Sequence, residues 1–213
     1  MLSTSTDDLW EAMRTARSIR RYRDEPVDRA VIDRCLEAAT WAPSGGNGQP
    51  WRFVLLEGEE QRSIIGEGAR RSWETMTTFY GLEVPAPDDH RPRSRTVRTM
   101  YEHMTGAETV PVCILFCVQP QRGTTELEQG GSIFPAVQNF LLAARSQGLG
   151  AAICLWHRTV DPEIRASVGI PDDWKIAATL SAGWPKGHHG PLTRRPVGEV
   201  ASVDRWIEAS GCR

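Results

Sequence analysis

The sequence predicts one domain whose fold combines α-helices with β-strands, and three observations lead to this prediction. The 213 residues suit a single domain, and no long linker or shift in composition divides them, so we assign residues 1–213 to one domain. Segments with helical periodicity alternate with short apolar segments of β-prone residues. No internal repeat or low-complexity tract indicates a solenoid or a propeller.

The N-terminal part predicts two helices. Residues 5–8 offer a helix cap and acidic groups, and a first helix then ends near Ala16. A second helix begins around Asp28, carries apolar residues at spacings of three and four, and stops before Pro43. Residues 43–50 are expected to form a loop.

The middle of the chain predicts a strand, a helix and an irregular excursion. Trp51–Leu56 is apolar and β-prone, and residues 59–80 have helical character up to Gly81. The segment from Leu82 to Arg95 contains three prolines among charged residues. We expect this segment to be an exposed, irregular excursion and a candidate lid.

The second half predicts three strands and two helices in alternation. Val110–Val118 is a continuous apolar run typical of a central strand, and Ser132–Gln147 carries an apolar helical stripe. Ala151–Trp156 and Ile176–Ala182 are the next two strands. Between them Asp161-Pro162 predicts a helix that begins with an N-cap and a proline at its first position.

Composition excludes several classes of function. Hydrophobic residues make up 40%, charged residues make up 24%, and the formal net charge is -2, as in ordinary soluble globular proteins. This balance gives no overall attraction to nucleic acid or to an anionic membrane, so any anion site must be local. The N-terminus is polar and no long apolar run is present, and we therefore expect a soluble, cytoplasmic protein.

The cysteines and histidines do not predict a metal site. Four of the five cysteines lie in apolar helix or strand patterns, which favours reduced thiols in a cytosol. Cys113 and Cys117 lack a second Cys or His pair at ligand spacing and are expected to be buried strand residues. His188 and His189 also lack a second ligand set.

A basic cluster follows the first predicted helix. Arg17, Arg20 and Arg21 gather around Ser18 in a chain that is otherwise nearly neutral. Guanidinium groups match phosphate oxygens and stay charged, so this cluster indicates a phosphate site. A solvated basic surface is the alternative interpretation, and on this cluster alone it is the favoured one.

A second cluster occupies the loop of residues 42–51. This loop holds three glycines together with Ser44, Asn47 and Gln49, between Trp41 and Trp51. Glycines allow the backbone to approach a planar ligand, and the amides supply donors and acceptors for a ring with carbonyl and imide edges, such as an isoalloxazine. A tight turn explains the glycines and prolines but not the amides.

Together these segments resemble the nitroreductase family. The similarity rests on the Arg-Ser-Ile-Arg segment from Arg17 and on the Ala-Pro-Ser-x-x-Asn-x-Gln-Pro-Trp segment. It continues through residues 134–150 and 182–185 to Arg194-Arg195-Pro196, and only residues 66–106 match no motif. The resemblance implies an α+β fold with a mixed, mainly antiparallel sheet flanked by helices, in a domain-swapped homodimer with two FMN sites at the subunit interface.

The resemblance also implies which residues bind FMN. Contacts to the ribityl chain and phosphate are expected from Arg17, Ser18 and Arg20, with Arg194 or Arg195 closing on the phosphate. The loop residues Ser44, Asn47 and Gln49 are expected to face the flavin, and the segment Leu155, Trp156 and His157 is expected near its ring.

The implied activity is hydride transfer from NAD(P)H to an electron-poor acceptor such as a nitroaromatic compound or a quinone. No catalytic side chain is required, because the flavin carries the electrons and the protein supplies binding and electrostatics. A nicotinamide and a planar acceptor would stack in turn on the same flavin face, which predicts ping-pong kinetics. Arg20 or a backbone amide is the candidate for stabilising the reduced flavin.

Two other functions were weighed. A Rossmann dehydrogenase is disfavoured, because Gly148-Leu149-Gly150 follows a predicted helix and precedes a strand, the reverse of the dinucleotide fingerprint. A flavin- or metabolite-binding protein that senses or stores its ligand without reductase turnover stays open. Relatives of this family also catalyse other reactions, so the resemblance narrows the cofactor more than the substrate.

Overall fold

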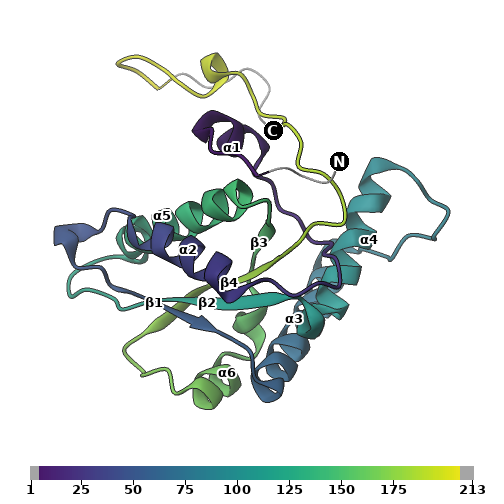
Figure 1. The fold of residues 1–213 in the computed structure, drawn as a ribbon, viewed down its shortest axis with the longest axis horizontal. Coiled ribbons are helices and arrows are strands. Elements are labelled where there is room, and N and C mark those ends of the chain that lie inside the picture. The colour runs from purple at the N-terminus through teal and green to yellow at the C-terminus, as the bar shows by residue number, and fades with distance from the viewer. Residues whose placement is uncertain (1–4, 207–213) are drawn as a thin grey trace.

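A computed structural model describes residues 5–206. Within them, four strands form one sheet in the order β1-β2-β4-β3 (Figure 1). The strands are β1 (Trp51–Leu55), β2 (Val112–Val118), β3 (Gly150–Cys154) and β4 (Lys175–Gly183). All three neighbouring pairs are antiparallel. The expected α+β fold with a mainly antiparallel sheet is therefore confirmed.

Helices cover both faces of the sheet and give the molecule three layers (Figure 1). Alternate side chains of β2 point to opposite faces, and every residue of that strand is buried. Ile114 and Phe116 pack with α2 (Arg29–Thr40) and α5 (Glu126–Ser146) in one core cluster. Cys113 and Leu115 belong to the other cluster, with α3 (Glu59–Tyr80) and α6 (Asp161–Val168).

Helix ends follow local chemistry where the sequence predicts it. Asp8 caps α1 (Leu9–Thr15) and Asp28 caps α2, each through a side-chain oxygen that accepts a backbone N–H. Helix α3 ends at Gly81, whose φ of 58° belongs to the left-handed region that favours glycine. These boundaries agree with the sequence-based expectation.

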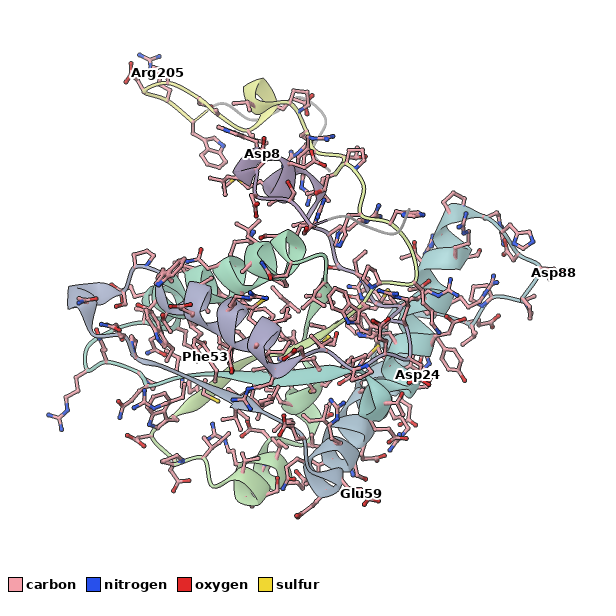
Figure 2. The ribbon with its side chains drawn as sticks, in the orientation of Figure 1. Asp8, Asp24, Phe53, Glu59, Asp88 and Arg205 are labelled. Carbon is pink, nitrogen blue, oxygen red and sulfur yellow. The ribbon has the colours of Figure 1, made fainter. Side chains whose placement is uncertain are left out.

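The excursion is shorter than expected, because an unexpected helix begins inside it. Helix α4 (Pro92–Thr105) starts with Pro92 in its first turn, so the expectation that Leu82–Arg95 is irregular throughout was wrong. Proline suits a first helical turn, where its missing N–H has no intrahelical partner. Residues 82–91 form the loop between α3 and α4, and Asp88 marks its outer end in Figure 2.

Three further boundaries differ from the expectation. Helix α5 begins at Glu126 rather than Ser132, because Thr125 and Glu128 form a capping box. Strand β3 ends at Cys154, and Trp156 opens the short 3₁₀ helix η3 (Trp156–Thr159). Asp161 is the first residue of α6 and not its N-cap, because Val160 occupies that position.

The four cysteines of the described part, Cys35, Cys113, Cys117 and Cys154, are free and buried. Among the described residues, no helix has the length and apolar character needed to cross a membrane. No group of three or more His, Cys, Asp or Glu side chains within residues 5–206 has the arrangement of a metal site.

Candidate functional site

The basic segment is held along the free edge of β3. Ser18 forms a parallel bridge with Ala151, and the Ile19 N–H donates to the Ala151 carbonyl at 3.1 Å. The fit is close, because a Cβ on Gly150 would lie 2.5 Å from Cγ2 of Ile19. This pairing places Arg17, Ser18 and Arg20 beside the end of the sheet.

The C-terminal tail returns to the same place and brings Arg194 with it. The tail runs from β4 past the segment to α1 (Figure 1). The Lys186 N–H donates to the Arg21 carbonyl at 2.9 Å, and the Leu192 N–H donates to the Arg14 carbonyl at 3.0 Å. Arg194 thereby joins Arg17 and Ser18 around a cavity of about 180 Å³ that Gln138, Arg145 and His189 also line.

The groups around this cavity suit a phosphate. In the part of the chain that the structure describes, Arg17 makes no ion pair or side-chain hydrogen bond, and no carboxylate lines the cavity. Both ring nitrogens of His189 are buried and form no hydrogen bond, although backbone groups of Thr15, Gly148 and Leu149 lie near the ring. Burial lowers the pKa of His189, so the neutral ring carries one N–H, from which a phosphate oxygen would accept as it would from Arg17.

A second basic hollow of about 370 Å³ adjoins the first. Arg17, Ser18 and Arg20 line it from one side, and Arg95, Thr96 and Thr99 of α4 line it from the other. Arg20 also has no ion pair or side-chain hydrogen bond within residues 5–206. Arg20 also lines a third hollow, which is the largest of the three and mostly apolar. It therefore lies between basic and apolar surroundings.

The third hollow is a largely apolar cavity of about 670 Å³. Its floor is the segment from Ile153 to Trp156, with Leu155 47% exposed and Trp156 buried. Helices α3 and α4 supply the other walls, with Met76, Phe79, Tyr80, Met100, His103 and Met104. An apolar cavity with a few polar groups is typical of a site for a small organic ligand or cofactor.

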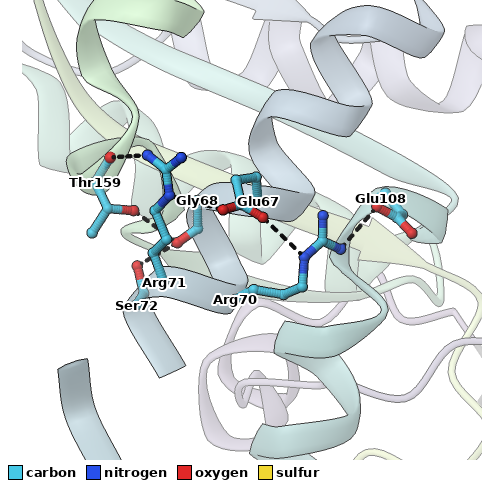
Figure 3. Close-up of polar contacts among 7 residues, drawn as sticks. All are labelled: Glu67, Gly68, Arg70, Arg71, Ser72, Glu108 and Thr159. Carbon is cyan, nitrogen blue, oxygen red and sulfur yellow. Dashed lines mark hydrogen bonds and ion pairs between the residues drawn. The ribbon is translucent and has the colours of Figure 1, made fainter. Parts of the chain in front are cut away.

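Helix α3 holds the floor through very close contact with η3. A Cβ on Gly68 would collide with the Trp156 carbonyl oxygen and with Val160, so only glycine fits there. The Thr159 hydroxyl donates to the Gly68 carbonyl at 2.9 Å, and Arg71 donates to the Thr159 carbonyl at 3.4 Å (Figure 3). Arg70 ties α3 to Glu108 at 3.0 Å. The backbone that carries Trp156 is thus well fixed.

His157 does not line the cavity with its side chain. Its ring is 4% exposed, and Nδ1 lies 2.9 Å from Oγ1 of Thr179 on β4. Burial lowers the pKa of His157 to about 4, so the ring is neutral at physiological pH. Of the expected segment, Leu155 and Trp156 reach the cavity, whereas His157 supports the sheet beneath it.

The second predicted cluster lies far from the first within one chain. The loop of residues 44–49 precedes β1, which is the opposite edge strand from β3. It adjoins the end of β2 where Trp51 pairs with Val118, whereas Ala151 pairs with Ala182 near the start of β2. The Gly45 N–H donates to Ser132 of α5 at 3.4 Å. Ser44, Asn47 and Gln49 therefore do not meet Arg17 in the same chain.

This loop has a defined local conformation. The Gln49 N–H donates to the Ser44 hydroxyl at 3.0 Å, and the Gln49 amide donates to Asn47 Oδ1 at 3.3 Å. Asn47 and Gln49 have φ values of 55° and 47°, which are uncommon for residues other than glycine. Held exposed in this way, the loop presents its polar groups outward.

Of the hollow-lining residues that were not predicted as site residues, three polar ones matter most. His103 lies in α4, which the sequence did not predict, and an isolated histidine carries no motif. Arg145 appears only as part of the family-like helix segment, although its Nε lies 2.8 Å from Oγ1 of Thr15 beside the first cavity. His189 was considered only as a metal ligand or general base, and its place beside Arg194 in the tail offered the missing clue.

Comparison with known proteins agrees with this geometry. The chain is 28% identical over 182 residues to a 5,6-dimethylbenzimidazole synthase of Rhodospirillum rubrum, with 81% of this chain and 80% of that protein covered. It is 26% identical over 200 residues to a nitrobenzene nitroreductase of Ectopseudomonas oleovorans, with 84% and 86% covered.

A solved structure is also similar. It is that of a putative nitroreductase from Desulfovibrio desulfuricans in complex with FMN, with a TM-score of 0.66, 25% identity, and 95% and 100% of the two chains covered. Residues 13–184 match the nitroreductase family, and these residues include β1 to β4 and the basic segment. The chain belongs to the nitroreductase family.

Proposed function

We propose that this protein is an FMN-dependent oxidoreductase that takes hydride from NAD(P)H and passes it to an electron-poor acceptor such as a nitroaromatic compound or a quinone. One observation carries the proposal: Arg17 and Arg20, which form no ion pair or side-chain hydrogen bond within residues 5–206, lead directly into a large apolar cavity. Membership of the nitroreductase family supports it. The free, buried cysteines also fit the cytoplasm that we expect.

The phosphate of FMN would lie at the basic end of this row of hollows, and its ring would lie at the apolar end. Arg17, Ser18, His189 and Arg194 would hold its phosphate through charge-assisted hydrogen bonds. Arg195 stays the alternative to Arg194. Arg20 stands where its charge would favour the reduced ring, whose chemistry is to accept and return hydride. The apolar walls would exclude water from the ring and offer a flat face to nicotinamide and acceptor in turn, as a ping-pong sequence requires.

We also propose that a second copy of the chain completes each FMN site. Ser44, Asn47 and Gln49 lie at the sheet edge opposite to Arg17 in one chain, so they reach the same flavin only from a partner subunit. A symmetric homodimer is the commonest way to bring such surfaces together. Asn47 and Gln49 are exposed, as this contact requires.

Absorbance spectroscopy of the purified protein tests the function. The protein is expected to show flavin bands that bleach on anaerobic addition of NADPH or NADH and return when a nitroaromatic compound or a quinone is added. Flavin bands that do not respond to either nucleotide would favour binding without turnover. The same mixture in air, assayed for 5,6-dimethylbenzimidazole, tests the activity named for the Rhodospirillum relative.

Mixing two defective chains tests the shared site. One chain carries Arg17→Ala with Arg20→Ala, and the other carries Ser44→Ala with Asn47→Ala. Each alone is expected to bind FMN poorly, whereas a mixed dimer contains one intact site and regains flavin. Light scattering should give the mass of two chains. A monomer, or no recovery on mixing, would contradict the shared site.

A further inference from the structure

A buried chain of polar groups lies behind the apolar cavity, and the proposed function does not use it. The Tyr22 hydroxyl lies 2.6 Å from the Ile19 carbonyl and 2.9 Å from Oγ of Ser181. Ser181 is fully buried on β4, and its Oγ lies 2.9 Å from Nε2 of His103. His103 is 5% exposed and lines the cavity.

Counting protons gives these hydrogen bonds a direction. A carbonyl oxygen can only accept, so the single Tyr22 proton is donated to Ile19 at the shortest of its contacts. The contact between Tyr22 and Ser181 then requires the Ser181 proton. With that proton used, Ser181 can only accept from His103, and Nε2 of His103 must carry a hydrogen.

The neighbouring thiol is compatible with this direction but does not set it. Cys154 lies 3.7 Å from Oγ of Ser181 and 3.7 Å from the Ala152 carbonyl. Burial raises the pKa of the Cys154 thiol to about 12, so this group keeps its proton. A carbonyl can only accept, so the thiol donates to Ala152, and the direction at Ser181 rests on Tyr22.

The direction of these hydrogen bonds determines the protonation of Nδ1, the other ring nitrogen of His103. A neutral imidazole with hydrogen on Nε2 has a bare Nδ1, which can only accept. Burial and the nearby Arg20 lower the pKa of His103 to about 3, so the ring is neutral. Within residues 5–206 no group forms a hydrogen bond with Nδ1, and this atom is not among the buried polar atoms that lack a partner. Nδ1 therefore stays accessible from the cavity that the ring lines.

The ring also has a fixed orientation. Its centroid lies 4.8 Å from that of Trp156 and 6.0 Å from that of Tyr22, in tilted and edge-on arrangements. Arg20, a donor, lines the same cavity as His103. The wall of this cavity thus carries both a hydrogen-bond donor and a hydrogen-bond acceptor.

We propose that His103 is a positioning residue whose Nδ1 accepts a hydrogen bond from the imide N–H of FMN, while Arg20 donates to a carbonyl beside that N–H. The inference rests on the proposed function. An imide edge presents an N–H between two carbonyl oxygens, which is complementary to one acceptor next to one donor. The Tyr22–Ser181 chain fixes the tautomer of His103 before FMN binds, so the acceptor is preorganised.

Binding of two flavins tests the inference without using activity. The full-length protein, freed of flavin, is titrated with FMN and with FMN methylated at the imide nitrogen. The wild type should prefer FMN by about tenfold, the effect of one buried acceptor left without a donor. His103→Phe should bind both flavins with equal affinity. His103→Asn, whose amide oxygen still accepts, should retain part of the preference.

The control is His90→Phe, the same replacement at an exposed histidine that lines none of the three hollows; it should keep the full preference. A His103→Phe protein that still discriminates between the two flavins would overturn the inference, as would a wild type that binds both flavins equally. The proposed function would survive either result, because it fails only if the wild type binds no FMN or if its bound flavin does not bleach with NADPH or NADH. An unchanged flavin preference with a raised KM for a phenolic acceptor would show that the acceptor, and not FMN, supplies the donor.

The tautomer has its own readout. Nitrogen chemical shifts of the His103 ring should show a hydrogen on Nε2 and none on Nδ1 in the flavin-free protein. Ser181→Ala removes the acceptor that fixes this arrangement and should allow both tautomers. A hydrogen on Nδ1 in the wild type would contradict the inference.

Discussion

The basic hollows and the apolar cavity meet at Arg20 but are built differently. Around the basic hollows, Arg17 and Arg20 have no partners within the described chain, and the His189 ring nitrogens are buried without hydrogen bonds. Behind the apolar cavity, by contrast, the buried hydroxyl of Ser181 is fully hydrogen-bonded. The charges of the first region await an anion, whereas in the second the groups that fix the His103 ring are paired before a ligand arrives. We therefore expect the basic end to supply affinity for the ligand and the apolar end to set its orientation.

The largest effect is expected from removing the unpartnered charges. Arg17→Ala combined with Arg20→Ala should release FMN, because each lost charge-assisted hydrogen bond to the phosphate or the ring costs roughly 1.5 to 3 kcal/mol. The affinity should fall by at least a hundredfold, measured by flavin fluorescence during titration. The folded state should survive, because these side chains form no ion pair or side-chain hydrogen bond within the described residues.

Arg21→Ala is the matched control. Arg21 is adjacent in sequence, but it pairs with Glu102 at 3.7 Å and lines none of the hollows. Its replacement should leave FMN affinity nearly unchanged, since exposed ion pairs contribute little. Full flavin occupancy in the Arg17 and Arg20 double variant would contradict the phosphate assignment and remove the difference between the two regions.

Two glycine replacements should each disturb one region alone, because each glycine makes a close contact that holds only that region. In Gly150→Ala the new methyl group meets the Ile19 side chain at 2.5 Å, which should push the basic segment away from β3. FMN affinity should fall about tenfold or more, because displacement of the phosphate ligands weakens several contacts together. Isothermal titration with FMN measures this loss. An unchanged affinity would show that the segment need not be held at the sheet edge.

Gly68→Ala should act on the other region. Its methyl group meets the Trp156 backbone, which cannot move away as a side chain can, and overpacking of this kind costs about 1 to 3 kcal/mol. The melting temperature should fall by roughly 2 to 10 °C at this chain length. Ser72→Ala on the same helix, whose hydroxyl bonds only the Gly68 carbonyl, should have a smaller effect. Equal stability of the Gly68 variant and the wild type would contradict the close contact.

The sheet and most helix positions were predictable from sequence because their signals are local. The apolar run of β2 and the caps Asp8 and Asp28 each act within a few residues. Helix α4 was missed because Pro92 and its charged neighbours were interpreted as a helix breaker. Proline also starts helices, and Val97, Met100 and Met104 formed a stripe that the charges obscured.

The candidate site was only partly predictable, for a physical reason. Arg17, Ser18 and Arg194 come together because the tail returns to α1 through backbone hydrogen bonds that no local pattern encodes. His103 depends on the packing of α4 against α3, and its tautomer depends on Ser181 of β4. Residues 126–131 are helical, although the helix was expected to begin at Ser132. The capping box at Thr125 starts α5 there, even though this segment contains two glycines.

Acid should lower the free energy of unfolding by a moderate amount through His157, which lies beneath the floor of the apolar cavity. The pKa of His157 is about 4 in the folded protein, lowered by burial from an ordinary value of 6.5. Below pH 6.5 the unfolded chain takes up a proton that the folded chain refuses, so stability is lost as pH falls toward 4. The loss from this residue is about 2 kcal/mol at pH 5.

Urea unfolding at pH 7.5 and pH 5 measures that loss. His157→Gln should flatten the pH dependence by this amount, while the exposed His90→Gln should not. An unchanged slope in the His157 variant would mean that its ring is protonated in the folded protein. Solvent would then reach the region beneath the cavity floor as it reaches the basic hollows, despite the burial of His157 in the structure.

The smallest effect is expected at the rim of the apolar cavity, where Phe79 lies 79% exposed near the end of α3. Its ring centroid lies 4.9 Å from that of Tyr80 in an edge-on arrangement, and both residues line the cavity. Phe79→Ala should raise the KM for a nitroaromatic acceptor about two- to fivefold, because one aromatic contact contributes roughly 0.5 to 1 kcal/mol. FMN affinity should not change, because Phe79 lines neither basic hollow. Met13→Ala, an exposed apolar residue that lines none of the three hollows, controls for loss of surface apolar area. If the basic hollows bind FMN and the rim contacts only the acceptor, Phe79→Ala should change acceptor binding alone. A parallel fall in the affinities for FMN and for the acceptor would mean that the two regions act as one site.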